Sequence, residues 1–477
     1  MKFYKIILPV LFLSTISCRK NMTDLNTNTK APSSVPSYTL FTTAQKNLSD
    51  AMATPNPQVN IFILLSQYYA QTTYVTEGNY QIDNTNLPQI WWGLLYRDAL
   101  NNFAEAKKLI PTDVKDRDVA RNQQDITDIM QVYAWSVLVN TFGNIPYTQA
   151  LEPNKYPFPV YDDAKTVYYD LLNRLDTSIA GLNINAGSFG SNDLIYNGNV
   201  KSWLVFANSL KLKMSMLIAD SDPTVSAKKV KEAVNGGVMS LNKDNALFNY
   251  LATPPNTNPQ WTTVIQSGRI DFVIAESLAD SLNKLNDPRR IHYFTTDITG
   301  SAYSGGVVGK SNAYANFSKP SSQVTAQQVP YIFMDCAETQ FLLAEAAARG
   351  MDVPGTVSNY YNNGIKASME YWGATTSEAN AYLLNPQVAY ATANGSTYKE
   401  KIGLQKWIAL YTRGFDAWTE LRRLHYPVLP KPVAAISDFP SRYRYPSGES
   451  TSNGINYKAA AAAIGGDLVT TKLFWNK

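Results

Sequence analysis

The stretch from Gly403 to Pro427 constrains the fold of this chain more than any other. Its sequence is GLQKWIALYTRGFDAWTELRRLHYP, and its large apolar residues recur at steps of three and four, the period of one face of an α-helix. This stripe consists of Leu404, Trp407, Tyr411, Phe415, Trp418 and Leu421. Because such large side chains need several neighbouring helices to cover them, the stretch predicts a buried helix that organises a helical core.

The polar residues of the same stretch predict a solvated, mainly basic edge on that helix. They are Lys406, Arg413, Asp416, Glu420, Arg422 and Arg423. Gly414 falls inside the expected helix, where glycine costs about 1 kcal/mol relative to alanine, so it indicates a close approach of another backbone segment. Pro427 ends the helix because it cannot continue the hydrogen-bonding pattern. The stretch therefore predicts core structure and no chemistry.

The helical period recurs along most of the chain. We expect further helices at 38–53, 59–73, 90–110, 125–142, 163–182, 200–219, 338–349 and 357–371. The third and fourth of these are similar to one tetratricopeptide unit of about 34 residues, and the last four form two more pairs in chain order. We therefore predict an all-α fold of stacked helix pairs, with the 403–427 helix packed against them.

Between residues 240 and 334 the helical period mostly fails. The sequence there is rich in Asn, Thr, Pro, Gly and Tyr, as in TPPNTNPQW and DITGSAYSGGVVGKSNAYANFSKPSSQ, and only short helices are expected, near 271–285 and 285–290. A loop region of this length inside an ordered domain is typical of a functional segment. Smaller irregular insertions are expected at 386–398 and 427–456.

Aromatic residues in polar loops are the positive signal for a ligand site. The candidates are Tyr74, Tyr80, Trp261, Tyr303 and Tyr314, which lie among Asn, Gln, Ser and Thr. Flat rings stack on the apolar faces of sugars, while neighbouring amides and hydroxyls pair with sugar hydroxyls. The alternative is that each ring only anchors its loop to the body. Taken together, the five predict a ligand-binding surface.

The charge of the chain argues against a nucleic-acid-binding protein. Charged residues make up 17% of the 477 residues, and the net charge is +4. Lysine and arginine do not alternate with aromatic residues in a run of the kind that lines a nucleic-acid groove. We therefore expect neutral contacts to carry recognition, a role that suits tyrosine because its ring tolerates a half-wet surface.

Cysteine and histidine usage predicts neither a metal site nor an internal disulfide in the mature chain. Cys18 lies in the leader, so Cys336 is the remaining cysteine, and His292 and His425 have no metal-spaced partner in the sequence. Cys336 stands at the start of an apolar helix and is expected to be a buried thiol. We expect no cofactor.

Two patterns suggest active sites but have simpler structural explanations. Residues 304–311, SGGVVGKS, lack the first glycine of a phosphate-binding loop, so they indicate a flexible glycine-rich loop. The carboxylates Asp271, Glu276, Asp280 and Asp287 could be compared with a glycoside hydrolase pair, which needs two facing carboxylates. Their spacing instead suits solvated or capping positions on one side of a short helix and its turn. We expect no enzymatic activity.

The N-terminal residues predict export and a lipid anchor. A basic start and an apolar run of eight residues, Ile6 to Leu13, form an export signal too short to span a bilayer. The small residues at 14–17 precede Cys18, an arrangement similar to a bacterial lipobox. We expect cleavage before Cys18 and acylation of its thiol, which would anchor the protein through buried alkyl chains. An ordinary secreted protein with a cysteine near its cleavage site is the alternative.

These features divide the chain into three parts. Residues 1–17 are the expected signal peptide, and residues 18–37 are a polar, proline-containing tether. Residues 38–477 form the expected helical domain, with the loop-rich insertion at about 240–334.

The stretch at 403–427 and the segments that follow it carry a family resemblance. Together with PSRYRYPSGESTSNGINYKAA (440–460) and the terminal TTKLFWNK, it resembles the C-terminal signature of the SusD/RagB nutrient-binding outer-membrane lipoproteins of Bacteroidetes, in their SusD-like branch. The resemblance covers nearly the whole mature chain. It implies a helical body with tetratricopeptide-like pairs and a loop-rich ligand face.

The same resemblance implies a function. Such a protein would be anchored to the outer membrane by its lipid, face the cell exterior and capture a nutrient, typically a glycan or oligosaccharide. It would then deliver this ligand to a SusC-type TonB-dependent transporter. Peptide capture in the same role, a lipid-anchored glycoside hydrolase and a helical scaffold that binds only proteins are the alternatives.

Overall fold

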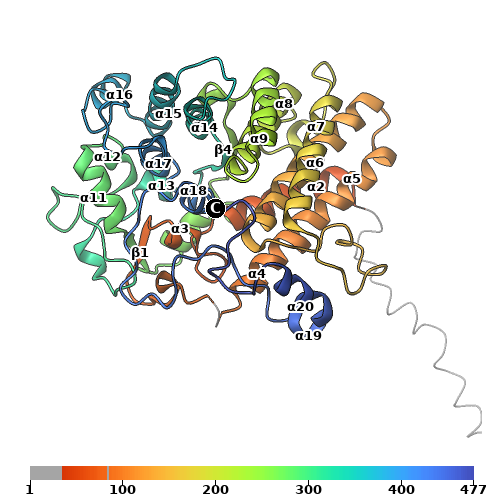
Figure 1. Ribbon diagram of the computed structural model, residues 1–477, viewed down its shortest axis with the longest axis horizontal. Coiled ribbons are helices and arrows are strands. Elements are labelled where there is room, and N and C mark those ends of the chain that lie inside the picture. The colour runs from red at the N-terminus through yellow and green to blue at the C-terminus, as the bar shows by residue number, and fades with distance from the viewer. Residues whose placement is uncertain (1–34, 83–84) are drawn as a thin grey trace, which may run out of the picture. The chain divides into compact units, whose positions relative to one another are not determined.

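The structure, a computed structural model, describes residues 35–82 and 85–477. The expected signal peptide, Cys18 and nearly all of the expected tether lie outside these residues. Residues 37–477 form one unit and are mainly helical, with four short strands, which confirms the all-α prediction (Figure 1).

The 403–427 stretch forms two helices, so the prediction of a single helix is wrong. Helix α17 (Tyr398–Ala409) ends before a short break, and helix α18 (Gly414–Leu424) follows it. In the break, Thr412 adopts a left-handed backbone with a φ of 73°. Gly414 is the first residue of α18, and a Cβ atom there would lie 2.5 Å from the backbone nitrogen of Ile63. The expected close backbone approach at Gly414 is therefore confirmed.

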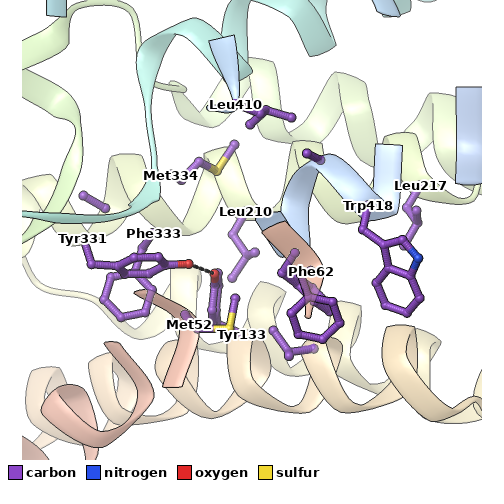
Figure 2. Packing of buried hydrophobic residues seen from close by; sticks show 14 of the residues in the cluster. Met52, Phe62, Tyr133, Leu210, Leu217, Tyr331, Phe333, Met334, Leu410 and Trp418 are labelled. Carbon is purple, nitrogen blue, oxygen red and sulfur yellow. Dashed lines mark hydrogen bonds between the residues drawn. The ribbon is translucent and has the colours of Figure 1, made fainter. Parts of the chain in front are cut away.

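The apolar face of α18 lies in the centre of the core. Trp418 is fully buried, and its ring stacks on Phe62 with centroids 5.1 Å apart. Phe62 belongs to helix α3 (Phe62–Leu65), which packs directly against α18. Figure 2 shows this region and, beside it, the hydroxyls of Tyr133 and Tyr331, which are hydrogen-bonded at 3.5 Å. The prediction of a buried core helix is confirmed.

The polar face of this stretch is also buried, so the prediction of a solvated basic edge is wrong. All six of its predicted edge residues have at most 6% of their surface exposed. The guanidinium of Arg413 contacts Glu338 at 2.5 Å, and that of Arg423 contacts Glu345 at 2.6 Å. Both carboxylates lie on helix α14 (Cys336–Ala348). The basic residues therefore face buried acids where the sequence suggested solvent.

Arg422 is buried, and its guanidinium contacts aromatic ring faces and backbone carbonyl oxygens. Its guanidinium carbon lies 3.4 Å from the ring centroid of Trp418 and 4.9 Å from that of Trp475. Its Nη1 donates to the carbonyl oxygens of Asn140 and Ser441, each at 2.8 Å. The guanidinium therefore joins α18 to the C-terminal segment through ring faces and backbone acceptors.

The first part of the domain is a layer of helices (Figure 1). Its members are α2 (Ser37–Ala53), α4 (Leu87–Gly93), the π-helical η3 (Leu94–Leu100), α5 (Asn101–Asp113), α6 (Arg117–Phe142) and α7 (Ala164–Gly181). The carboxylate of Asp116 caps α6 by accepting the backbone N–H groups of Asp118 and Val119. Helix α6 packs against both α5 and α7, which confirms the first predicted helix pair.

The middle part contains two further helix pairs. They are α8 (Val200–Leu217) with α9 (Pro223–Gly236), and α14 with α15 (Val357–Trp372), which α16 (Thr376–Leu383) follows. The pair of α14 and α15 was predicted. The glycines that follow these two helices, Gly350 and Gly373, have φ angles of 73° and 95°. Helix α9 was not predicted. It is the main partner of α8, so the expected pairing of 163–182 with 200–219 is a minor contact.

The predicted helix at 59–73 is wrong. After the single turn of α3, strand β1 (Tyr69–Gln71) pairs antiparallel with β3 (Phe272–Ile274), with Tyr69 opposite Ile274 and Gln71 opposite Phe272. A second ribbon joins β2 (Ala246–Phe248) to β4 (Tyr331–Met334). Strands β1 and β3 lie about 200 residues apart in the sequence, and each is too short to show the alternating pattern of a strand. The apolar run around β1 therefore suggested a helix.

The 240–334 region is made of loops and short elements around these strands. The elements are η5 (Asn242–Asp244), α10 (Pro259–Trp261), the π-helical η6 (Thr262–Gln266), α11 (Glu276–Leu285), α12 (Arg290–Tyr293), η7 (Tyr314–Asn316) and α13 (Ser322–Thr325). Elsewhere lie η2 (Glu77–Asn79), η4 (Gly190–Asn192), α19 (Glu449–Ser452) and α20 (Gly454–Ala463). Within residues 35–82 and 85–477, none of the helices has the length and apolar character needed to cross a bilayer.

Candidate functional site

A cleft of about 600 Å³ lies at one end of the β1–β3 ribbon. Three segments line it: the turn at 56–58, the chain at 71–77 and the chain at 262–272. The lining residues are Asn56, Pro57, Gln58, Gln71, Tyr74, Thr76, Glu77, Thr262, Thr263, Ser267, Arg269, Asp271 and Phe272. A volume of this size is in the range of about 300–1,000 Å³ found for small-molecule sites.

The ribbon holds the floor of the cleft. Gln71 and Phe272 are opposite each other at the last register position, so both side chains point to the same face. Beyond that position Thr72 continues the pairing, since its N–H donates to Asp271 O at 2.9 Å and its hydroxyl to Ile270 O at 2.6 Å. The two chains therefore leave the ribbon side by side, and both contribute to the cleft wall.

Tyr74 presents its ring at the cleft. With 65% of its surface exposed, Tyr74 is available to a ligand, and the guanidinium of Arg269 lies 5.9 Å from its ring centroid. Arg269 is in turn held by Asp271, with Nε and Oδ2 separated by 2.5 Å. An exposed ring beside a neutralised ion pair suits stacking by an uncharged ligand.

The remaining polar groups of the cleft are mostly uncharged. They are amides and hydroxyls from Asn56, Gln58, Gln71, Thr76, Thr262, Thr263 and Ser267. Glu77 is the other carboxylate, and its Oε2 accepts from Gln71 Nε2 at 3.0 Å and from Thr76 Oγ1 at 3.2 Å. Such groups can donate to and accept from sugar hydroxyls.

The predicted site residue Trp261 is not among the residues that line the cleft. It is half-buried and directly precedes Thr262 and Thr263, which line the cleft. The side chain of Asn258 caps this segment, accepting from Gln260 N at 2.6 Å and donating to Val329 O at 2.6 Å. These bonds therefore fix the beginning of the cleft segment at 262–272 to the rest of the domain.

Tyr303 and Tyr314 are half-buried and do not line this cleft. Tyr303 packs against Phe294, with ring centroids 6.3 Å apart. Tyr314 packs on a small apolar cluster that includes Ala70 and Val273. Those two strand residues are opposite each other on the face of the ribbon away from Gln71 and Phe272. The structure therefore separates the five predicted aromatic residues and does not gather them on one platform.

The prediction that Tyr80 presents its ring to a ligand is wrong. Tyr80 is only 3% exposed, and its ring packs edge-on against Phe439 with centroids 6.0 Å apart. Burial raises the pKa of its hydroxyl to about 12. Its left-handed backbone, with a φ of 66°, turns the chain inward after η2. The ring anchors its loop, which was the alternative.

The candidate acids do not form a hydrolase pair in the described residues. Asp271 is paired with Arg269, and Asp287 forms a fully buried ion pair with Arg289 at 2.6 Å. Burial, followed by the nearby charge of Asp280, raises the pKa of Glu276. Across residues 35–82 and 85–477 there is also no group of three or more His, Cys, Asp or Glu side chains suited to a metal ion.

The phosphate-loop and nucleophile alternatives have structural explanations. In the loop at 304–311, a Cβ atom on Gly305 would lie 2.3 Å from the backbone nitrogen of Glu276, so this glycine is required by packing. Cys336 is buried, as predicted, and burial raises the pKa of its thiol to about 12. A thiol with so high a pKa carries little thiolate at neutral pH and is a poor nucleophile.

Sequence reasoning missed most of the cleft. Neither Pro57 nor the residues at 262–269 were singled out from the sequence as site residues. The available signal was the polar composition of NPQ at 56–58 and TTVIQSGR at 262–269, which flank the aromatic residues. What could not be inferred was that pairing of β1 with β3 joins these segments.

Comparison with known proteins shows which family and which solved structures are similar to this chain. A family model described as "Starch-binding associating with outer membrane" matches residues 28–446. No curated protein matches the chain.

Solved structures match over almost the full length. One, named a chitin-binding protein, is 26% identical and superposes with a TM-score of 0.80, covering 92% of this chain and 99% of the other. A SusD homolog from Bacteroides uniformis is 28% identical with a TM-score of 0.78, and the coverage is again 92% and 99%. A chitin-binding SusD homolog from Flavobacterium johnsoniae is 25% identical with a TM-score of 0.77, covering 92% and 98%.

Proposed function

The chain belongs to the SusD-like family, and from that premise we propose that it captures a glycan in the cleft beside Tyr74. The family is associated with the outer membrane and binds carbohydrate without catalysis, so the chain is a binding protein and not an enzyme. The chitin-binding relatives and the starch-binding description support an oligosaccharide as the ligand class.

The exposed ring of Tyr74 at the cleft wall is the observation that carries the proposal. The ring has 65% of its surface free and stands over a floor of amides and hydroxyls. A sugar ring has apolar faces and hydroxyl edges, so it can stack on Tyr74 while its edge bonds to Gln71 or Thr263. Trp261 would extend this wall along a longer chain.

The cellular setting is also part of the proposal. A signal peptide at 1–17 would be removed, and Cys18 would carry the lipid that anchors the protein to the outer membrane, with the domain facing the cell exterior. The tether at 18–37 would hold the domain of 38–477 above the membrane. A SusC-type TonB-dependent transporter would receive the ligand. These steps rest on the leader sequence and on the family resemblance.

Titration calorimetry with chitohexaose and maltohexaose tests the ligand class and the site. We expect one of them to bind, and Tyr74→Ala to weaken its affinity about tenfold, because one stacked ring contributes about 0.5–1.5 kcal/mol beyond its buried area. Tyr38→Ala is the matched control, since Tyr38 is 45% exposed on α2 and does not line the cleft.

Salt dependence separates a glycan from a peptide ligand. Neutral contacts predict an affinity that changes little between low and high salt. Peptide binding whose affinity falls steeply with salt and depends on Arg269 would favour the alternative of peptide capture in the same cleft. Unchanged affinity of the Tyr74→Ala variant would contradict the site.

A further inference from the structure

A second pocket of about 460 Å³ lies between α4, α19 and the loop at 146–160. Its wall includes Trp92, Tyr156, Asn101, Gln149 and Glu449 together with several prolines. It shares no residue with the cleft beside Tyr74. In Figure 1, the labels of α4 and α19 lie apart from that of β1, the strand at whose end the cleft beside Tyr74 lies.

Aromatic packing fixes the floor of this pocket. Trp92 is half-buried, and its ring packs edge-on against Phe142 with centroids 5.0 Å apart and tilted against Tyr96 at 4.7 Å. The Tyr96 hydroxyl donates to Pro146 O at 2.6 Å. The Trp92 ring therefore already has a fixed position, so little conformational freedom is lost when a ligand packs against it.

The opposite wall is also held in place. Asn453 Nδ2 donates to Pro159 O at 2.8 Å, and the Val160 N–H donates to Gln149 Oε1 at 3.0 Å. The Tyr161 hydroxyl donates to Glu449 Oε2 at 2.5 Å. The bond of Val160 closes the loop at 146–160 on itself, and the other two attach the loop and Tyr161 to α19 and to Asn453 directly after it, so the pocket is preformed.

Several polar groups at this pocket have no hydrogen-bond partner in the part of the chain that the structure describes. They are the indole N–H of Trp92, the side-chain amide of Asn101 and the amide nitrogen of Gln149. The charged residues are one arginine, Arg97, which is paired with Asp98, and one glutamate, Glu449. The site thus offers rings and neutral donors, and its two charges are of opposite sign.

We propose that this pocket is a second carbohydrate site, which takes a short stretch of neutral sugar units. The inference rests on the proposed function, since the same ligand class is assigned to both places. Sugar faces would pack on Trp92 and Tyr156, and sugar hydroxyls would pair with the free amide of Asn101. A glycan with many repeats could occupy both sites in one protein or in neighbouring ones, which raises its avidity without any new contact.

Fluorine NMR of protein labelled with 5-fluorotryptophan can report on the two sites separately. The chain has nine tryptophans, among which Trp92 lies in the pocket and Trp261 next to the cleft. Trp203 is fully buried and serves as the internal control. Replacing each of these three by phenylalanine in turn assigns its resonance.

Titration with chitohexaose and maltohexaose should shift the resonance of Trp92 and leave that of Trp203 in place. In the Asn101→Ala variant we expect the half-saturation concentration at Trp92 to rise at least fivefold, while the response of Trp261 is kept. Asn173→Ala, an exposed asparagine on α7 outside the pocket, is the matched control and should behave as the parent. In the Tyr74→Ala variant the response of Trp92 should persist.

The outcomes separate this inference from the proposed function. If Trp261 responds and Trp92 does not, the pocket is no carbohydrate site and the proposed function stands. If Trp92 responds equally in Asn101→Ala and the parent, the assigned geometry of the pocket is wrong. If neither tryptophan responds to either oligosaccharide, both proposals are overturned.

Discussion

Replacing Glu345 by glutamine tests whether the buried charges of α14 and α18 stabilise the fold. Both oxygens of Glu345 bond the Arg423 guanidinium at 2.6 Å, and Oε1 also accepts from Arg349 Nε at 2.9 Å. The side chains of Glu345 and Arg423 are 1% and 2% exposed. Glutamine keeps the shape of the side chain but removes its negative charge, so the buried positive charge of Arg423 is no longer fully neutralised.

The magnitude follows from the pKa of Glu345. Burial by itself would raise this pKa, but the charge and hydrogen bonds of Arg423, together with the charges of Arg349 and Lys406, outweigh burial and hold the pKa at about 2, below the ordinary 4.5. A shift of that size corresponds to about 3 kcal/mol of preference for the charged form in the folded state. Removing one partner of a buried pair typically costs about 3–5 kcal/mol, so we expect a loss of this size at pH 7.

The pH dependence has a definite sign. Because the pKa is depressed in the folded state, the stabilisation is complete above the unfolded value of 4.5 and is lost as pH falls towards 2. The gap in unfolding free energy between the parent and Glu345→Gln should therefore narrow by about 2 kcal/mol between pH 7 and pH 3.

Urea denaturation followed by circular dichroism at pH 7, 5, 4 and 3 measures this gap. Glu105→Gln is the matched control, because Glu105 forms an exposed pair with Lys108 at 3.7 Å, and such pairs contribute at most about 1 kcal/mol. A Glu345→Gln variant as stable as this control at pH 7, or a gap that stays constant down to pH 3, would refute the reasoning.

Three further predictions concern the core and the anchor. Trp418→Ala should lower the free energy of unfolding by about 3–5 kcal/mol, because the ring is fully buried, and a melting temperature within a degree of the parent would contradict its burial. Gly414→Ala should destabilise far more than the benefit of about 1 kcal/mol that alanine brings to a helix, because its Cβ atom would lie 2.5 Å from Ile63 N; equal or higher stability in a thermal melt would contradict the close approach. Cys18→Ser should move the protein from the membrane fraction to the soluble fraction, and a variant that resists a carbonate wash would contradict the lipid anchor.

The core helices were predictable because their signal is local. The apolar period of 403–427 identified Trp418 as buried, and the glycine inside it indicated a close backbone approach, which the structure places at Ile63. The burial of Arg413 and Arg423 in ion pairs was not predictable from the same stretch. Their partners Glu338 and Glu345 lie more than 70 residues away in the sequence, and burial of a charge depends on such partners.

The break at Thr412 and the strand at Tyr69 were not predicted from the sequence, for related reasons. The apolar stripe continues across Thr412, although the backbone of Thr412 is left-handed and interrupts the helix. The period of apolar residues shows which side chains are buried, but it does not show whether the backbone between them is one continuous helix. The run around Tyr69 is buried on both sides, and strands of three residues give no period to recognise.

For the candidate cleft, the sequence predicted the kind of residue involved but not which segments come together. Tyr74 was correctly identified as an aromatic residue in a polar loop, and the structure places it at the cleft. Tyr80 has the same local composition but is buried, because its left-handed backbone directs it towards Phe439. The cleft itself depends on the pairing of β1 with β3, a contact between segments 200 residues apart that no single stretch encodes.

A crystal structure of the protein with a bound oligosaccharide tests the central claim most directly. Soaking with whichever of chitohexaose and maltohexaose binds in calorimetry should give density for a sugar ring stacked on Tyr74, about 4 Å from its face, with hydroxyls bonded to amides or hydroxyls of the cleft. An oligosaccharide bound elsewhere, with the cleft beside Tyr74 left open, would contradict the account.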